Sequence, residues 1–160
     1  MTLDELRENL TFPRWVAYSY YVDDLPIGEI MTFMGGGNES SADVAAAYLA
    51  PFPEQIYKAA AQIMPYLVPS QLRENEAAWD VFRNWQKPFL VAFTDSDPVT
   101  RGGERAFLNQ VPTAQNVTIR GAGHFVQEDA GEALAVLITE FLDGVELPQE
   151  IDATYRGSLD

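Results

Sequence analysis

The sequence has no cysteine and only one histidine, and each shortage narrows the chemistry that the chain can perform. Without cysteine there are no disulfides, no thiol nucleophiles and no cysteine-ligated zinc sites, and this composition fits a cytoplasmic protein. Because His124 is the single histidine, any imidazole chemistry must take place there. The sequence predicts no cofactor and no metal centre.

Positive charge is scarce as well. The chain has 10 Lys and Arg residues against 24 Asp and Glu residues, which gives a formal net charge of −14 at pH 7. Nucleic acids and anionic membrane surfaces are bound by clustered cations, so we expect neither as a partner. No apolar run reaches the roughly 18 residues of a membrane-spanning helix, and no basic segment opens the chain, so we expect no membrane span and no signal peptide.

The residues that are present suffice for one compact domain of 160 residues, with 47% hydrophobic and 12% aromatic side chains for its core. Residues 1–87 read as a series of helices, with a glycine-rich loop at residues 35–38 and a helix that is predicted to stop at Pro65. Residues 88–145 alternate between strand and helix. Residues 146–160 are acidic and without periodicity, so they predict a frayed tail.

The second region has the pattern of a parallel α/β sheet. Residues 89–93, Phe-Leu-Val-Ala-Phe, form a continuous apolar run that is typical of a strand buried on both faces. A helix near residues 103–111, a second strand at 117–119 and a helix at 128–142, with Gly144 just past its end, complete a β-α-β-α order. Two strands are too few for a free-standing sheet, so we expect part of a larger one.

Polar residues follow both predicted strands. Asp95 and Asp97 follow the first strand, and His124 follows the second. Loops at the carboxyl ends of parallel strands converge, and neighbouring strands lie about 5 Å apart, so an acid there can hold the histidine ring as in a hydrolytic triad. An ordinary turn and helix start around Pro98, and a purely structural histidine, remain open alternatives.

Three segments resemble haloalkane dehalogenases, a branch of the α/β-hydrolase superfamily. Residues 121–129, Gly-Ala-Gly-His-Phe-Val-Gln-Glu-Asp, resemble the histidine loop of that family. Residues 87–100 are similar to its acid-bearing strand and turn, and residues 48–53, Tyr-Leu-Ala-Pro-Phe-Pro, to part of its helical cap. The resemblance, which extends from about residue 12 to residue 142, implies the C-terminal part of an α/β-hydrolase fold: a cap or lid at 1–87, a β-α-β-α core part at 88–145 and an acidic tail at 146–160.

The resemblance also implies roles for individual residues. Asp97, which directly precedes Pro98, is implied to be the catalytic acid, and His124 the base. The implied reaction is cleavage of a carbon–halogen bond in a small apolar substrate through an alkyl-enzyme ester. Trp15 is implied to bind substrate or halide through its indole N–H; the alternative is that Trp15 only packs on the core of the cap.

The sequence departs from the family pattern at the nucleophile. The family carries its nucleophile on a G-x-D-x-G-like elbow, and no such motif occurs here. We therefore expect a chain that starts after the nucleophile, through natural truncation, a misassigned start codon or an engineered start. Such a chain would be inactive alone and would self-associate through an unpaired sheet edge. An ester or epoxide hydrolase with the same acid and histidine, or a non-catalytic fragment that folds only with strands from another polypeptide, are the remaining alternatives.

Overall fold

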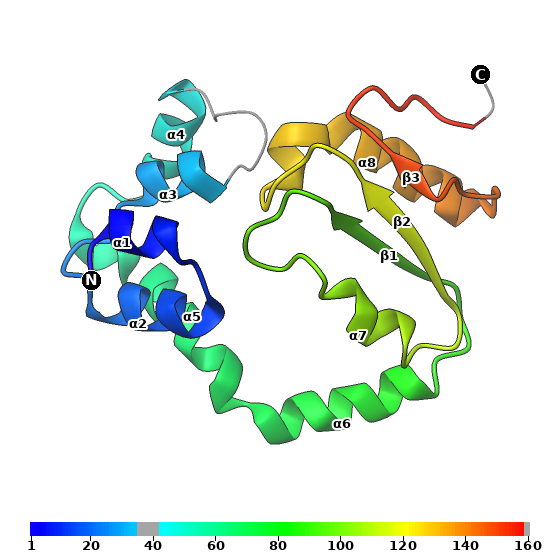
Figure 1. The fold of residues 1–160 in the computed structure, drawn as a ribbon, viewed down its shortest axis with the longest axis horizontal. Coiled ribbons are helices and arrows are strands. Elements are labelled where there is room, and N and C mark those ends of the chain that lie inside the picture. The colour runs from blue at the N-terminus through cyan, green and yellow to red at the C-terminus, as the bar shows by residue number, and fades with distance from the viewer. Residues whose placement is uncertain (35–41, 159–160) are drawn as a thin grey trace. The chain divides into compact units, whose positions relative to one another are not determined.

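The computed structural model describes residues 1–34 and 42–158, which form parts of two compact units (Figure 1). Unit 1 comprises Met1–Phe33 and Ser40–Glu76, and unit 2 comprises Met34–Glu39 and Ala77–Asp160. The glycine-rich loop predicted at residues 35–38 lies outside the described residues.

Unit 1 consists of short helices. They are α1 (Leu3–Glu8), α2 (Phe12–Tyr21), α3 (Ile27–Met34), α4 (Ala42–Leu49), the 3₁₀ turn η1 (Gln55–Lys58) and α5 (Ala59–Ser70). The first begins with a capping box, in which the Glu5 N–H donates to the Thr2 hydroxyl and the Thr2 N–H donates to the Glu5 carboxylate. This pair satisfies two N–H groups that the helix start would otherwise leave without acceptors.

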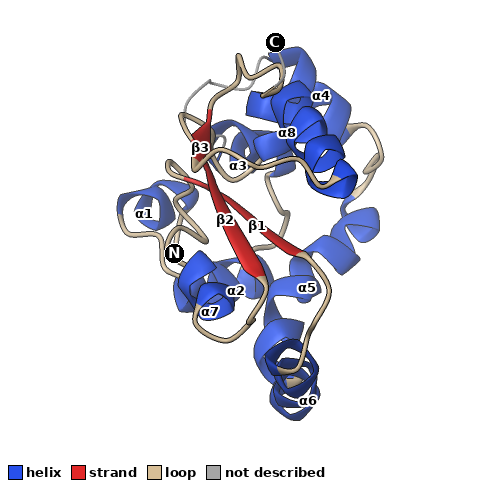
Figure 2. Cartoon of the chain, turned by 90° about the vertical axis from the view of Figure 1, so that its right-hand side faces the viewer, coloured by secondary structure: helices blue, strands red, loops and turns tan. Residues whose placement is uncertain are grey.

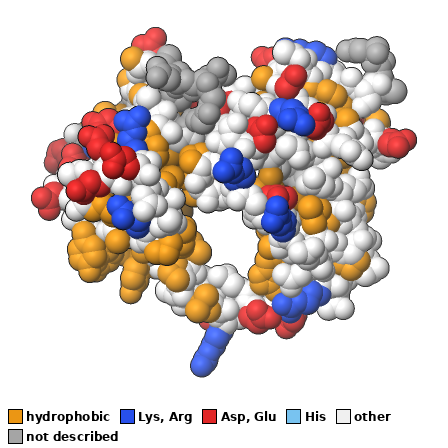
Figure 3. All heavy atoms as spheres, viewed as in Figure 1, with side chains coloured by type: hydrophobic (Ala, Val, Ile, Leu, Met, Phe, Trp, Pro, Cys, Tyr) orange, Lys and Arg blue, Asp and Glu red, His pale blue; other side chains and the backbone are white. Residues whose placement is uncertain are grey.

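The interior of unit 1 combines apolar side chains with one buried cation. Its buried apolar residues are Leu6, Tyr18, Leu25, Ile30 and Met31. Lys58 is only 6% exposed, and its ammonium donates to Oδ1 of Asp24 at 2.7 Å and to the Leu25 carbonyl at 2.9 Å. These acceptors compensate for the removal of the charge from water. Figure 3 shows hydrophobic side chains gathered over α2 and α5. Exposed aromatics of these helices include Tyr20, Tyr21 and Tyr66.

The prediction that a helix stops at Pro65 was wrong. Helix α5 runs from Ala59 to Ser70 with Pro65 and Pro69 inside it. Each proline removes one backbone hydrogen bond, but packing can outweigh that loss. Here α5 lies against α2, where the rings of Tyr66 and Tyr20 are 5.4 Å apart.

Unit 2 has the predicted α/β organisation. Helix α6 (Leu72–Arg83) leads into β1 (Phe89–Thr94), α7 (Glu104–Leu108), β2 (Ala114–Ile119), α8 (Val126–Asp143) and β3 (Glu150–Ile151). The strands form a parallel sheet in the order β1-β2-β3, with Ala92 opposite Val117 and Ile119 opposite Ile151. The third strand is an addition to the two that the sequence predicted.

Both faces of β1 are covered by helices of unit 2. Phe89 and Phe93 point to one face, where they contact Phe107 of α7 at ring-centroid distances of 6.0 and 6.3 Å. The alternate residues Leu90 and Ala92 point to the opposite face and pack against the core that α8 shares with β2 and β3. Figure 2 shows α7 and α8 on opposite sides of the strands. The continuous apolar run is thereby explained, because each face of the strand packs against a helix.

Helix α6 also packs on this unit, although the sequence grouped residues 77–87 with the helical region. Its Trp79 and Phe82 rings lie 5.2 and 6.4 Å from the ring of Phe107, and Phe82 lies 5.6 Å from Phe89. The division between the two units therefore falls at residues 76–77 within α6 rather than at residue 88.

The expectation of a frayed tail at 146–160 was wrong for the described residues. Ile151 is 4% exposed, and β3 pairs with β2 through hydrogen bonds from the Thr118 N–H to the Gln149 carbonyl and from the Arg120 N–H to the Ile151 carbonyl. Farther on, the Tyr155 hydroxyl and the Ser158 N–H both donate to the Glu140 carboxylate of α8. A strand of two residues is too short to produce a periodic sequence pattern, so this order was invisible in the sequence.

Candidate active site

The candidate site lies where β1 and β2 end. Thr94 and Ile119, the last residues of these strands, are opposite each other in the sheet. Beyond them the two loops stay hydrogen-bonded, because the Asp95 N–H donates to the Ile119 carbonyl and the Ser96 N–H donates to the Ala122 carbonyl. These two backbone hydrogen bonds hold the acidic loop and the histidine loop together beyond the ends of the strands.

The structure brings Asp97 and His124 into hydrogen-bond contact. Nδ1 of His124 is 3.0 Å from Oδ2 and 3.1 Å from Oδ1 of Asp97. The Asp97 side chain is 6% exposed and that of His124 is 31% exposed, so the carboxylate is shielded while part of the ring faces solvent. With Nδ1–H donated to the carboxylate, the neutral ring carries its lone pair on Nε2, where it can accept a proton.

The Asp97 carboxylate is held by its own loop as well. Its Oδ1 accepts the N–H groups of Val99 at 2.6 Å and Thr100 at 3.0 Å, and its Oδ2 accepts the Thr100 hydroxyl. Burial by itself raises the pKa of Asp97, but the hydrogen bonds from Thr100, His124 and Val99 outweigh it and hold the pKa below its ordinary value. Asp97 is therefore a carboxylate at neutral pH.

Thr100 was missed in the sequence analysis. Its position three residues after an aspartate at a turn is a signal that could have identified it, since such a side chain can bond back to the aspartate.

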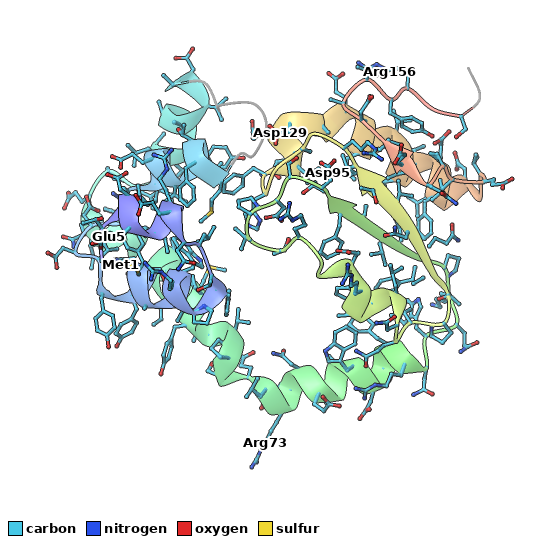
Figure 4. All side chains as sticks on the ribbon, in the orientation of Figure 1. Met1, Glu5, Arg73, Asp95, Asp129 and Arg156 are labelled. Atoms are coloured by element: carbon cyan, nitrogen blue, oxygen red, sulfur yellow. The ribbon has the colours of Figure 1, made fainter. Side chains whose placement is uncertain are left out.

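Asp95 serves a different purpose from Asp97. Its Oδ1 accepts the Gly121 N–H at 2.8 Å and the Ser96 hydroxyl at 3.0 Å. It therefore fixes the start of the histidine loop and does not contact the ring. The labelled Asp95 in Figure 4 lies at this end of the strands. The geometry agrees with the prediction that Asp97, not Asp95, meets His124.

Trp15 lies in the other unit, on α2. Its ring stacks on that of Tyr18, with centroids 6.2 Å apart and planes inclined by 27°. The structure therefore describes Trp15 by this contact within unit 1.

Residues 1–34 and 42–158 contain neither a metal-binding cluster nor a membrane-spanning helix. No group of three or more His, Asp or Glu side chains there is placed to hold a metal ion. Within the same residues, no helix is long and apolar enough to cross a bilayer.

Comparison with known proteins relates this site to a family. The chain is 38% identical over 139 residues to a haloalkane dehalogenase of Psychrobacter cryohalolentis, a match that covers 82% of this chain and 46% of that relative. It is 36% identical over 136 residues to a haloalkane dehalogenase of Mycobacterium marinum, covering 81% of this chain and 46% of the relative. The match to haloalkane dehalogenase 1 of Mycobacterium tuberculosis is 36% over 137 residues, with 81% and 45% covered. No protein-family profile matches the sequence.

The chain spans about half the length of the curated relatives it matches, and the matched half is their C-terminal part. Its helices and parallel three-stranded sheet are consistent with part of an α/β-hydrolase fold. By sequence, the chain is a homologue of the C-terminal part of haloalkane dehalogenases.

Proposed function

We propose that Asp97 and His124 are the acid and the base of a hydrolase that cleaves carbon–halogen bonds. The observation that carries the proposal is the hydrogen bond of 3.0 Å between Nδ1 of His124 and Oδ2 of Asp97 at the ends of neighbouring parallel strands. The sequence relation to haloalkane dehalogenases supports the choice of substrate, a small apolar haloalkane.

The proposed reaction has two steps. In the first, a carboxylate nucleophile displaces halide from the substrate carbon, which forms an alkyl-enzyme ester and releases the halide ion. In the second, Nε2 of His124 takes a proton from water while the water oxygen attacks the ester carbonyl. Asp97 stabilises the resulting imidazolium, which gives its proton to the oxygen of the departing alcohol. The carboxylic acid left at the nucleophile then releases its proton to solvent, so the carboxylate is regenerated and the net products are alcohol, halide and one proton.

The nucleophile is not supplied by a motif within these 160 residues, which contain no G-x-D-x-G sequence. We propose that a polypeptide of these residues alone does not turn over haloalkanes, because a histidine cannot replace the covalent step. A halide-binding role for Trp15 and a cytoplasmic location stay predictions from the sequence.

A chimaeric protein tests the proposal. The part of the Psychrobacter relative that precedes the matched region would be joined to this chain, and halide release from a brominated alkane would be measured. We expect sustained release. In the His124→Ala variant we expect about one equivalent of halide per protein and then arrest, because the ester forms but is not hydrolysed.

The outcomes of this test separate the alternatives. Asp143→Asn, which changes an exposed carboxylate at the end of α8, is the control and should keep full turnover. Unchanged turnover in His124→Ala would contradict the proposal. A chimaera that hydrolyses an ester or an epoxide and releases no halide would favour the rival hydrolase chemistry.

We also propose that the chain self-associates through the edge of β1. Within the described sheet β1 pairs only with β2, and beside it lies a groove of about 580 Å³ that is lined by apolar residues. Ile138 and Leu142 of α8 line this groove and are 42% and 76% exposed. An open strand edge flanked by apolar side chains is a site for pairing with a second copy.

Sedimentation of matched lysine variants tests this association. Leu142→Lys places a charge in the groove, and Ile56→Lys places the same charge on unit 1 at a similar exposure of 72%. We expect the first variant to lower the association constant by at least tenfold and the second to leave it unchanged. A monomeric wild-type chain would contradict the proposal.

A further inference from the structure

The Gly123 residue that precedes His124 is hydrogen-bonded through both of its backbone polar groups. Its N–H donates to Oδ2 of Asp129 at 2.7 Å, and its carbonyl accepts the Thr94 hydroxyl at 2.9 Å. Gly123 and Thr94 are both buried. A buried backbone group without a hydrogen-bond partner destabilises the fold. The side chains of Asp129 and Thr94 therefore fix the orientation of the peptide units on either side of Gly123, directly before the histidine.

Asp129 reaches this peptide because α8 is not a continuous helix. Ala130 has non-helical backbone angles, with φ −145° and ψ 33°, so Val126–Asp129 form a turn that is set off from the rest of the helix. The Glu128 N–H donates to the Phe125 carbonyl at 2.9 Å within that turn. An acidic residue in a first helical turn is commonly explained by the helix dipole, but the contact with Gly123 gives Asp129 a specific acceptor role.

Two carboxylates therefore hold the histidine loop from opposite ends. Asp95 accepts the N–H of Gly121, at the start of the loop, and Asp129 accepts the N–H of Gly123, directly before the histidine. Figure 4 labels both residues at this end of the strands. The peptide that Asp129 holds is the nearer of the two to His124, because Gly123 directly precedes the histidine. Both hydrogen bonds have a carboxylate acceptor, so they are charge-assisted and stronger than bonds to a neutral acceptor.

We infer that Asp129 is a positioning residue for His124. Through the Gly123 peptide it keeps the imidazole turned so that Nδ1–H is donated to Asp97 and Nε2 is left to accept a proton. The inference deepens the proposed function and rests on it for the role of the histidine. Asp129 itself contacts neither the ring nor a reacting atom in this arrangement.

The state of the ring can be read directly, because the chain contains one histidine. In ¹⁵N NMR of the purified, histidine-labelled chain, we expect the neutral ring to be the Nδ1–H tautomer, with its lone pair on Nε2. Asp129→Ala should lose this preference and show a mixture of both tautomers. Asp129→Asn keeps an amide oxygen for the Gly123 N–H and should retain at least half of the wild-type preference.

Two further variants complete the experiment. Asp143→Asn removes an exposed negative charge from the same helix and should leave the spectrum unchanged. Asp129→Glu keeps the charge but moves the acceptor by one methylene, and it should lose the tautomer preference as the alanine variant does. Circular dichroism establishes that each variant is folded before its spectrum is compared.

A folded Asp129→Ala chain with the wild-type ring spectrum would overturn the inference. If the alanine variant does not fold, the Asp129→Glu variant decides. A wild-type ring spectrum for Asp129→Glu would overturn the inference. Failure of Asp129→Glu to fold would also overturn it, because Asp129 would then be needed for folding only. The proposed function fails separately: a wild-type chain without the Nδ1–H form, or an Asp97→Ala variant with an unchanged spectrum, contradicts the Asp97–His124 pair itself.

Discussion

Asp97 faces His124 with both oxygens of its carboxylate, which lie 3.0 and 3.1 Å from Nδ1. The same carboxylate also accepts the N–H groups of Val99 and Thr100. Its orientation is therefore fixed by its own loop, independently of the contact with the histidine ring. A carboxylate that is fixed and charged can stabilise an imidazolium without moving, which is the requirement for the acid of a hydrolytic triad.

The stability of the chain should depend on pH through Asp97. Because its pKa in the folded chain is held below the unfolded value of about 3.9, Asp97 stabilises the fold fully above that value and loses this contribution as pH falls through the folded pKa. Urea unfolding of wild type and Asp97→Asn from pH 6 to pH 2 measures it. The difference in free energy of unfolding should shrink as the pH falls below about pH 4; a difference that grows over that range would contradict the assignment.

Removal of the Thr100 hydroxyl should raise the pKa of Asp97. This hydroxyl donates to Oδ2, so Thr100→Val deprives the charged form of one of its donors, whereas Thr100→Ser retains it. The ¹³C shift of the Asp97 carboxyl, followed against pH, measures the change. Thr139→Val is the control, because that hydroxyl donates to the Ala135 carbonyl on α8 and should not affect the titration. Equal titration curves for Thr100→Val and wild type would contradict the prediction.

Tyr155→Phe should loosen the segment that carries β3. The variant removes the hydroxyl donated to Glu140, although the Ser158 N–H still donates to that carboxylate. We expect faster hydrogen exchange at the Thr118 and Arg120 amides, which donate to residues of this segment. Tyr57→Phe, at a side chain that is 57% exposed in unit 1, should exchange as wild type does.

The same segment should respond to acid. The Ser158 N–H and the Tyr155 hydroxyl lower the pKa of Glu140, so the attachment is complete above the ordinary glutamate pKa and weakens as the pH falls through the lowered value. Exchange of the Arg120 amide, corrected for its intrinsic pH dependence, should therefore show less protection at pH 3 than at pH 6. Equal protection at both values would mean that Glu140 does not hold the segment.

Leu137→Ala should destabilise unit 2 by about 2–5 kcal/mol, because Leu137 is fully buried in the core between α8 and the sheet. Leu72→Ala makes the same chemical change at a side chain of α6 that is 68% exposed, and we expect an effect within about 0.5 kcal/mol. Urea unfolding of the two variants measures the contrast. Similar losses would indicate that the two leucines have comparable surroundings.

The sequence predicted the parts of unit 2 that have strong local patterns. The apolar run at β1, the long amphipathic stripe of α8 and Gly144 as its left-handed terminus, with φ +74°, all follow from local chemistry. The contact between Asp97 and His124 was predictable because strand ends in a parallel sheet meet at one edge. The choice between Asp95 and Asp97 came from the family resemblance and not from local pattern.

Other features depend on tertiary contacts that leave no local pattern. Pro65 within α5 is tolerated by packing against α2, and β3 arises from a two-residue pairing with β2. The break at Ala130, which allows Asp129 to reach Gly123, lies inside an otherwise regular apolar stripe. The periodicity of apolar residues indicates which face of a helix or strand is buried. It does not predict a break in the backbone at a single residue.

The position of β3 beside β2 sets a limit on assembly. In the order β1-β2-β3, the last strand covers the edge of β2 with only two residues, and Glu150 there forms an ion pair with Arg120 at 2.5 Å. Two copies joined through their β1 edges would pair about a two-fold axis, and the outer ends of the joined sheet would then be the short, charged β3 strands. Because charged and very short edge strands resist further pairing, association should close at two chains instead of propagating into a fibre.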